Sequence, residues 1–101
     1  MKDQVHKREP GSRRVSLRYG GRVQGVGFRF TVVHLSRRFD VTGYVCNEYD
    51  GSVFLVAEGA EPVLLEFLRA IRLSQLGRYI TSETASWSDA TGEFDAFGVK
   101  Y

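Results

Sequence analysis

Apolar residues recur with two different periods along the chain, and the change of period marks the secondary-structure elements. Every second residue is apolar between 15 and 19, which predicts a strand. Between 28 and 39 the apolar residues are three or four positions apart, as on the buried face of an amphipathic helix. The same spacing returns from 64 to 71, in a helix that starts near Pro62 and ends near Gly77. The two apolar stripes are Phe28, Val32, Leu35 and Phe39 in the first helix and Leu64, Phe67, Leu68 and Ile71 in the second.

Four further segments predict strands. Two of them, about 42–47 and 52–58, are joined by the residues 48–51, a hairpin turn with a strong Asp-Gly signal. A weakly apolar strand over 79–87 follows the second helix, and a last strand covers 93–101. The order β-α-β-β-α-β-β predicts an α+β fold, a ferredoxin-like α/β sandwich with a mostly antiparallel sheet and two helices on one face.

The composition fits one small globular domain. Of 101 residues 43% are hydrophobic and 26% charged, and no apolar run approaches the roughly 20 residues that cross a membrane. The single cysteine, Cys46, cannot form an internal disulfide, so we expect a reducing, cytoplasmic environment. One cysteine and two histidines are too few for a zinc site of the usual four-ligand kind. Nothing in the pattern requires an oligomer, so we expect a monomer.

The net charge of +2 is unevenly distributed. Residues 1–14 hold five basic and two acidic side chains without periodic pattern, which predicts a disordered basic tail. Residues 15–101, the predicted domain, hold nine basic and ten acidic side chains. This near-neutrality argues against nucleic-acid binding, although aromatic side chains on a ferredoxin-like sheet can stack on bases. The candidates for such stacking are Phe54, Tyr79, Trp87 and Phe97, for which packing in the core is the simpler interpretation.

A glycine-rich segment, residues 20–27, joins the first predicted strand to the first helix. It is either a tight connection that needs positive φ angles, or a cradle whose N–H groups and adjoining helix N-terminus bind an anion. Arg29 lies in the first helical turn, where the interaction of a cation with the helix dipole is unfavourable by about 0.3–1 kcal/mol. An anion bound at the same position would make the electrostatic interaction favourable. An Arg29 that points to solvent or pairs with a carboxylate fits the sequence equally well.

Asn47 ends the second predicted strand. Alternation places it on the same face as Val45, while Cys46 shares the other face with Tyr44. Asparagine is unfavourable in strands, so Asn47 either begins the following turn or supplies a neutral amide that orients a water or a substrate oxygen. The residues alone leave both interpretations open.

Two segments taken together resemble the two signatures of the acylphosphatase family. They are Gly21-Arg22-Val23-Gln24-Gly25-Val26-Gly27-Phe28-Arg29 and Gly43-Tyr44-Val45-Cys46-Asn47-Glu48-Tyr49-Asp50-Gly51-Ser52-Val53, with Gly59 six residues later. Their order and separation match the family, and the resemblance covers residues 15–101. It implies an α/β sandwich enzyme that hydrolyses the mixed anhydride of a carboxylic acid and phosphate without a metal, a cofactor or a covalent intermediate.

The resemblance also implies roles for individual residues. Arg29 takes the place of the arginine that binds the phosphate, and Asn47 that of the asparagine that positions the attacking water. The expected phosphate-binding residues are Gln24, Gly25, Val26, Gly27, Phe28 and Arg29. The expected partner is a small acyl phosphate, with carbamoyl phosphate, acetyl phosphate and 1,3-bisphosphoglycerate as candidates, and neither a nucleic acid nor a membrane.

Cys46 departs from the family pattern, because the position before the asparagine is often basic in stand-alone acylphosphatases. A Cys-Asn pair resembles the acylphosphatase-like N-terminal domain of carbamoyltransferases that mature hydrogenases, although Phe30 stands where those domains tend to have proline. The alternative function is therefore a non-catalytic anion- or acyl-phosphate-binding module. We expect Cys46 to be a buried thiol beside the site and not a nucleophile, because no base is evident for it.

Overall fold

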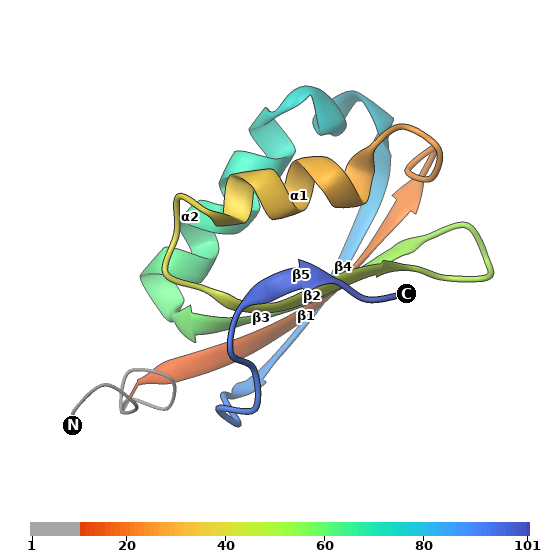
Figure 1. The fold of residues 1–101 in the computed structure, drawn as a ribbon. Coiled ribbons are helices and arrows are strands. Elements are labelled where there is room, and N and C mark those ends of the chain that lie inside the picture. Colours follow the sequence, from red (N-terminus) through yellow and green to blue (C-terminus); the bar gives the residue numbers. More distant parts are fainter. Residues whose placement is uncertain (1–10) are drawn as a thin grey trace.

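The computed structural model describes residues 11–101, so the expected disorder of residues 1–10 lies outside the described part. Two α-helices cover one face of a five-stranded sheet (Figure 1), which confirms the predicted ferredoxin-like fold. The elements are β1 (Ser12–Gly21), α1 (Phe28–Ser36), β2 (Thr42–Asn47), β3 (Val53–Ala60), α2 (Glu61–Leu73), the 3₁₀ helix η2 (Gln75–Tyr79), β4 (Ile80–Asp89) and β5 (Phe97–Val99). None of these helices is long and apolar enough to cross a membrane.

The strand order of the sheet is β4-β1-β3-β2-β5. The pairings of β1 with β3, β1 with β4 and β2 with β3 are antiparallel, whereas β5 runs parallel to β2. The parallel register places Phe97 opposite Gly43 and Val99 opposite Val45. The chain beyond β5 therefore continues toward the end of β2, where Asn47 lies.

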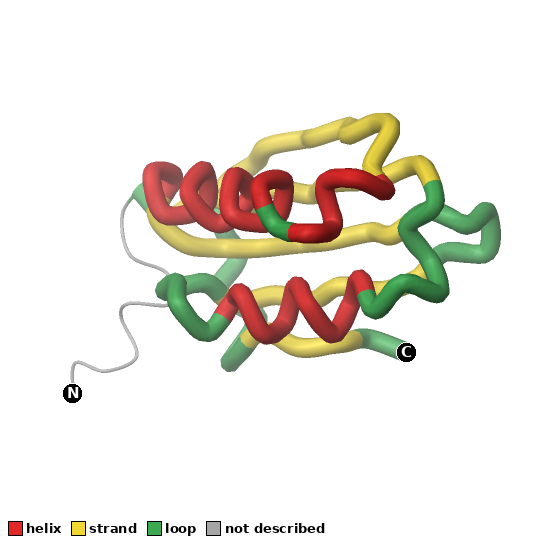
Figure 2. The backbone as a smooth tube through the Cα atoms, turned by 90° about the horizontal axis from the view of Figure 1, so that it is seen from above, coloured by secondary structure: helices red, strands yellow, loops and turns green. Residues whose placement is uncertain are grey.

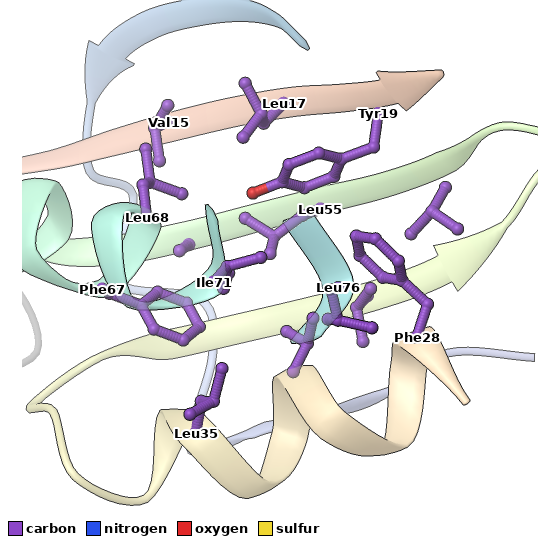
Figure 3. Close-up of a cluster of buried hydrophobic side chains, with 14 of the residues drawn as sticks. Val15, Leu17, Tyr19, Phe28, Leu35, Leu55, Phe67, Leu68, Ile71 and Leu76 are labelled. Atoms are coloured by element: carbon purple, nitrogen blue, oxygen red, sulfur yellow. The ribbon is translucent and has the colours of Figure 1, made fainter. Parts of the chain in front are cut away.

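The core lies between the helices and the sheet, and Figure 2 shows the two helices next to each other above the strands. Val15, Leu17 and Tyr19 are at most 2% exposed, because alternate residues of β1 all point toward the helices (Figure 3). The ring of Tyr19 contacts the ring of Phe28, the first residue of α1, with 5.1 Å between their centroids. This contact attaches the N-terminus of α1 to the end of β1.

Both helices end earlier than the sequence predicts, α1 before the end of its apolar stripe at Phe39 and α2 before the expected end near Gly77. After Ser36 the chain forms successive turns, in which Arg38 N–H donates to Leu35 O and Phe39 N–H to Ser36 O. Phe39 still packs against the core, so the apolar stripe outlasts the helix. The second helix ends at Leu73, and residues up to Tyr79 form η2 instead of more α-helix.

A buried carboxylate, Glu58, determines two boundaries that the sequence pattern misplaces. Glu58 is 3% exposed and accepts hydrogen bonds from Arg14 Nε at 2.7 Å and from the N–H groups of Thr91 and Gly92 at 3.0 Å each. Because Arg14 binds this carboxylate on the neighbouring strand, residues 12–14 belong to β1 and not to the tail.

The last strand is shorter than the predicted 93–101, because residues 93–96 lie outside it and β5 contains Phe97–Val99 alone. The N–H groups of Thr91 and Gly92, just before this segment, bind the Glu58 carboxylate and hold the chain away from the sheet there. The fourth strand runs slightly longer than predicted, from Ile80 to Asp89.

Hydrogen bonding lowers the pKa of Glu58. Burial alone would raise this pKa, but the N–H groups of Thr91 and Gly92 and the Arg14 guanidinium stabilise the carboxylate more than burial penalises it. A carboxyl group whose folded-state pKa is depressed contributes stability above its unfolded-state pKa, and this stability is lost as the pH falls through the folded-state pKa.

We expect Glu58→Gln to lower the free energy of unfolding by about 2–4 kcal/mol near neutral pH, because it leaves Arg14 without its buried anion. The difference between the variant and the original protein should begin to shrink as the pH falls below the unfolded-state pKa of about 4.3, and should disappear once the pH has fallen through the lower folded-state pKa of Glu58. Urea unfolding of both proteins at a series of pH values measures this difference in the free energy of unfolding. A difference that is independent of pH would contradict the assigned role of the charge.

Candidate active site

The glycine-rich loop between β1 and α1 is held to the fold by its non-glycine residues. Val23 is fully buried in the core, and Arg22 N–H donates to Tyr79 O at 3.0 Å. Gly25 and Gly27 have φ angles of 80° and 77°, which side chains other than glycine rarely adopt. Open space lies beside both glycines. The loop is therefore anchored at Arg22 and Val23, and its glycines leave room for a bound group.

The N-terminus of α1 lacks the usual stabilising groups. Within residues 11–101 no side chain caps the helix, and its first turn contains no acidic residue. Gly27 occupies the N-cap position in a left-handed conformation, and the basic Arg29 follows two residues later. The free N–H groups and the positive end of the helix dipole favour an anion at this position.

A cleft of about 190 Å³ lies in front of this helix N-terminus and contains both predicted catalytic residues. Arg29 enters it from α1, and Asn47 enters it from the end of β2. Asn47 shares a face with the buried Val45, as the alternation predicts, so it lies on the helix side of the sheet. The residues that line the cleft are Val23, Gly25, Gly27, Phe28, Arg29, Phe30, Asn47, Val99 and Tyr101.

Arg29 forms no ion pair with a carboxylate within residues 11–101. Its guanidinium instead lies over the ring of Tyr101, 5.4 Å from the ring centroid. Sequence reasoning missed Tyr101, Val99 and Phe30 as cleft residues. The alternation of apolar residues toward the C-terminus was the available signal, but the cleft position of Val99 and Tyr101 follows from the parallel pairing of β5 with β2.

The side chain of Gln24 connects the loop to the turn that follows Asn47. Its Nε2 donates to the carbonyl oxygens of Glu48 and Ser52, both at 2.8 Å. The same two oxygens accept hydrogen bonds within the turn, from Gly51 N–H at 3.2 Å and Glu48 N–H at 2.9 Å. Gln24 thus fixes the distance between the glycine-rich loop and the end of β2 that carries Asn47.

Cys46 lies on the opposite face of β2 from Asn47 and is half-buried. Burial raises the pKa of its thiol, and the hydrogen bond from Sγ to Glu48 Oε2 at 3.4 Å raises it further. A protonated thiol that faces away from the cleft is a poor nucleophile. Within residues 11–101 no three histidine, cysteine or acidic side chains are grouped as metal ligands.

The four aromatic residues considered for base stacking do not share a surface. Tyr79, Trp87 and Phe97 pack against the core. Phe54 lies on the helix-free face of the sheet, where the guanidinium of Arg18 covers its ring at 5.1 Å from the centroid. These four aromatic side chains therefore form no common stacking platform.

The fold and the cleft define a small α+β domain in which an uncapped helix N-terminus faces a cleft lined by Arg29 and Asn47. A family model of acylphosphatases matches residues 15–99, and the chain belongs to this family. It is 44% identical over 88 residues to an acylphosphatase of Salinibacter ruber, a match that covers 87% of this chain and 93% of that protein. An acylphosphatase of Arthrobacter sp. is 41% identical over 88 residues, which are 87% of this chain and 81% of that protein.

Solved structures agree with this assignment. The crystal structure of acylphosphatase from Bacillus subtilis superimposes with a TM-score of 0.78 at 30% identity, over 88% of this chain and 99% of that one. A structure of full-length HypF, at 23% identity, has a TM-score of 0.78 over 93% of this chain and 12% of that one, and shares the fold. The higher identity to the acylphosphatases favours the enzyme over the non-catalytic binding module. The chain is a hydrolase of acyl phosphates.

Gly27→Ala tests the strained start of α1. We expect a loss of about 1–2 kcal/mol in the free energy of unfolding, because alanine at a φ of 77° is strained although no neighbour blocks its Cβ. Gly98→Ala is the matched control, since its Cβ also meets open space but its φ is not positive. Urea unfolding of both variants makes the comparison, and equal effects would show that Gly27 is not required for its conformation.

Proposed function

We propose that Arg29 and the N–H groups of residues 24–28 bind the phosphoryl group of the acyl phosphate, while Asn47 orients the attacking water. The observation that carries this proposal is the common cleft, which joins Arg29, the uncapped start of α1 and Asn47. A guanidinium fork matches two phosphoryl oxygens, and N–H groups that are already held in place stabilise the third.

The chemistry requires little beyond these groups. The water oxygen attacks phosphorus, the bond between phosphorus and the acyl oxygen breaks, and a carboxylate leaves with the bonding electrons. A phosphoryl oxygen of the substrate accepts the proton of the water. Because a carboxylate is a good leaving group, the reaction needs no general acid, and the neutral amide of Asn47 orients water through one donor and one acceptor.

We further propose that the protein acts as a monomer in a reducing compartment such as the cytoplasm. The single cysteine cannot form an internal disulfide, which supports the reducing compartment, and nothing in the apolar pattern requires a second subunit. The natural substrate is a small acyl phosphate.

We expect Asn47→Ala to lower kcat for benzoyl phosphate roughly 100- to 1,000-fold, with little change in inhibition by inorganic phosphate, because the amide acts on the water alone. Arg29→Ala should lower kcat, raise KM and weaken phosphate inhibition, since the guanidinium binds phosphate in both the ground and transition states. Steady-state hydrolysis in excess chelator measures all three quantities.

Arg37→Ala is the matched control for the lost charge, because Arg37 is exposed at the opposite end of α1. We expect it to keep the activity of the original protein. A fully active Asn47→Ala variant would remove the proposed role of the amide. Phosphate inhibition that survives Arg29→Ala unchanged would remove the role of the guanidinium.

Gln24→Met tests whether the bridge between the loop and the turn positions Asn47. Methionine keeps the length of the side chain but cannot donate to Glu48 O and Ser52 O. We expect kcat to fall about tenfold, with phosphate inhibition nearly unchanged, because two hydrogen bonds contribute about 0.5–1.5 kcal/mol each.

A double-mutant cycle separates positioning from general destabilisation. If Gln24 acts through Asn47, Gln24→Met should have almost no further effect on kcat in an Asn47→Ala background. Glu66→Met, at an exposed residue of α2 that lines neither the cleft nor its neighbouring hollows, controls for the introduced methionine. Additive losses in the double variant would contradict the positioning role.

A further inference from the structure

The direction in which the acyl group leaves follows from the chemistry of phosphoryl transfer. In an in-line displacement the attacking and leaving oxygens lie on opposite sides of phosphorus. If the water is held by Asn47, as in the function proposed above, the acyl group must lie on the side of the phosphate away from Asn47. The surroundings of the cleft then indicate which residues the acyl group meets.

Two neighbouring hollows share lining residues with the cleft. One is lined by Gln24, Asn47, Glu48, Tyr49 and Tyr101, so it adjoins the cleft at Asn47 and Tyr101. The other adjoins the cleft at Phe30 and shares no lining residue with the first. Of these two hollows, the one beside Phe30 is the one that an acyl group pointing away from Asn47 can reach.

Phe30 is unusual for a residue of a helix in a small domain. Its side chain is 80% exposed, on the first turn of α1, directly after Arg29. Phe28, on the same helical turn, points the other way and is buried in the core. Phe30 is therefore not part of the apolar stripe that packs against the sheet. An exposed ring at the edge of a binding cleft offers apolar area to a ligand at little conformational cost.

The hollow beyond Phe30 has a volume of about 350 Å³ and lies between α1 and the junction of α2 with η2. Besides Phe30 its lining residues are Thr31, His34, Ser74 and Gln75, and the hydroxyl of Ser74 already donates to Ile71 O and accepts from Leu76 N–H. The surface that these residues present to the hollow is largely apolar. The arrangement fits an acyl group with a flat, apolar part next to its carbonyl.

We infer that Phe30 determines the acyl-group specificity of this site and favours acyl phosphates with an aromatic or comparably large apolar acyl group. The ring of Phe30 packs against that group, and longer acyl groups continue into the groove formed by Thr31, His34, Ser74 and Gln75. Small acyl groups such as acetyl are too short to gain from this contact. The inference rests on the water position given by Asn47 in the proposed function.

The test compares benzoyl phosphate with acetyl phosphate in the original protein and in Phe30→Ala. We expect kcat/KM for benzoyl phosphate to fall about three- to tenfold, the contribution of one aromatic contact, and kcat/KM for acetyl phosphate to remain unchanged. Phe30→Tyr should restore the preference. The ratio of kcat/KM for benzoyl phosphate to kcat/KM for acetyl phosphate is compared between the proteins, so the different intrinsic reactivities of the two substrates cancel.

Tyr49→Ala is the matched control, because Tyr49 is a fully exposed aromatic residue of the hollow on the Asn47 side. We expect it to leave the benzoyl-to-acetyl ratio unchanged. A ratio that is unaffected by Phe30→Ala, or that falls with Tyr49→Ala instead, would overturn the inference while leaving the enzyme function intact. Failure of the original protein to hydrolyse either substrate would instead overturn the function on which the inference rests.

Discussion

The geometry of the site depends on one buried aromatic contact, between Tyr19 at the end of β1 and Phe28 at the start of α1. The ring centroids are 5.1 Å apart and both residues are at most 2% exposed. Because the glycine-rich loop spans the short distance between these two residues, the contact holds both of its ends. The hydroxyl of Tyr19 is buried and has no protein hydrogen-bond partner among residues 11–101, so the contact with Phe28 is made by the ring.

Several features of the cleft are unfavourable in isolation and become favourable with a bound anion. Arg29 lies at the positive end of the α1 dipole, the first N–H groups lack a side-chain cap within the described residues, and Gly27 adopts a left-handed conformation. A phosphoryl group would pair with the guanidinium, accept hydrogen bonds from the N–H groups and reverse the sign of the dipole interaction. Local conflicts of this kind are expected at functional sites, where the core compensates for them.

The sequence predicts what periodicity and local signals govern, and fails where distant residues meet. The bounds of β2, Thr42–Asn47, and the shared face of Val45 and Asn47 follow from alternation. The Glu58 hydrogen bonds join residues more than 30 positions apart, so neither the start of β1 nor the shortened β5 was predictable from local pattern. The side chain of Gln24 binds two carbonyl oxygens 24 and 28 positions away, which the motif does not reveal.

The side chains of the cleft indicate what kind of catalysis this fold supports. Within the described chain, the residues that line the cleft include no carboxylate, histidine or cysteine. Enzymes that use general acid–base chemistry place such groups at the reacting atoms. A reactive mixed anhydride makes them unnecessary, because the carboxylate leaves without protonation. What the protein must supply is position, and the buried aromatic contact, the Gln24 bridge and the glycine-rich loop all restrict position without titrating.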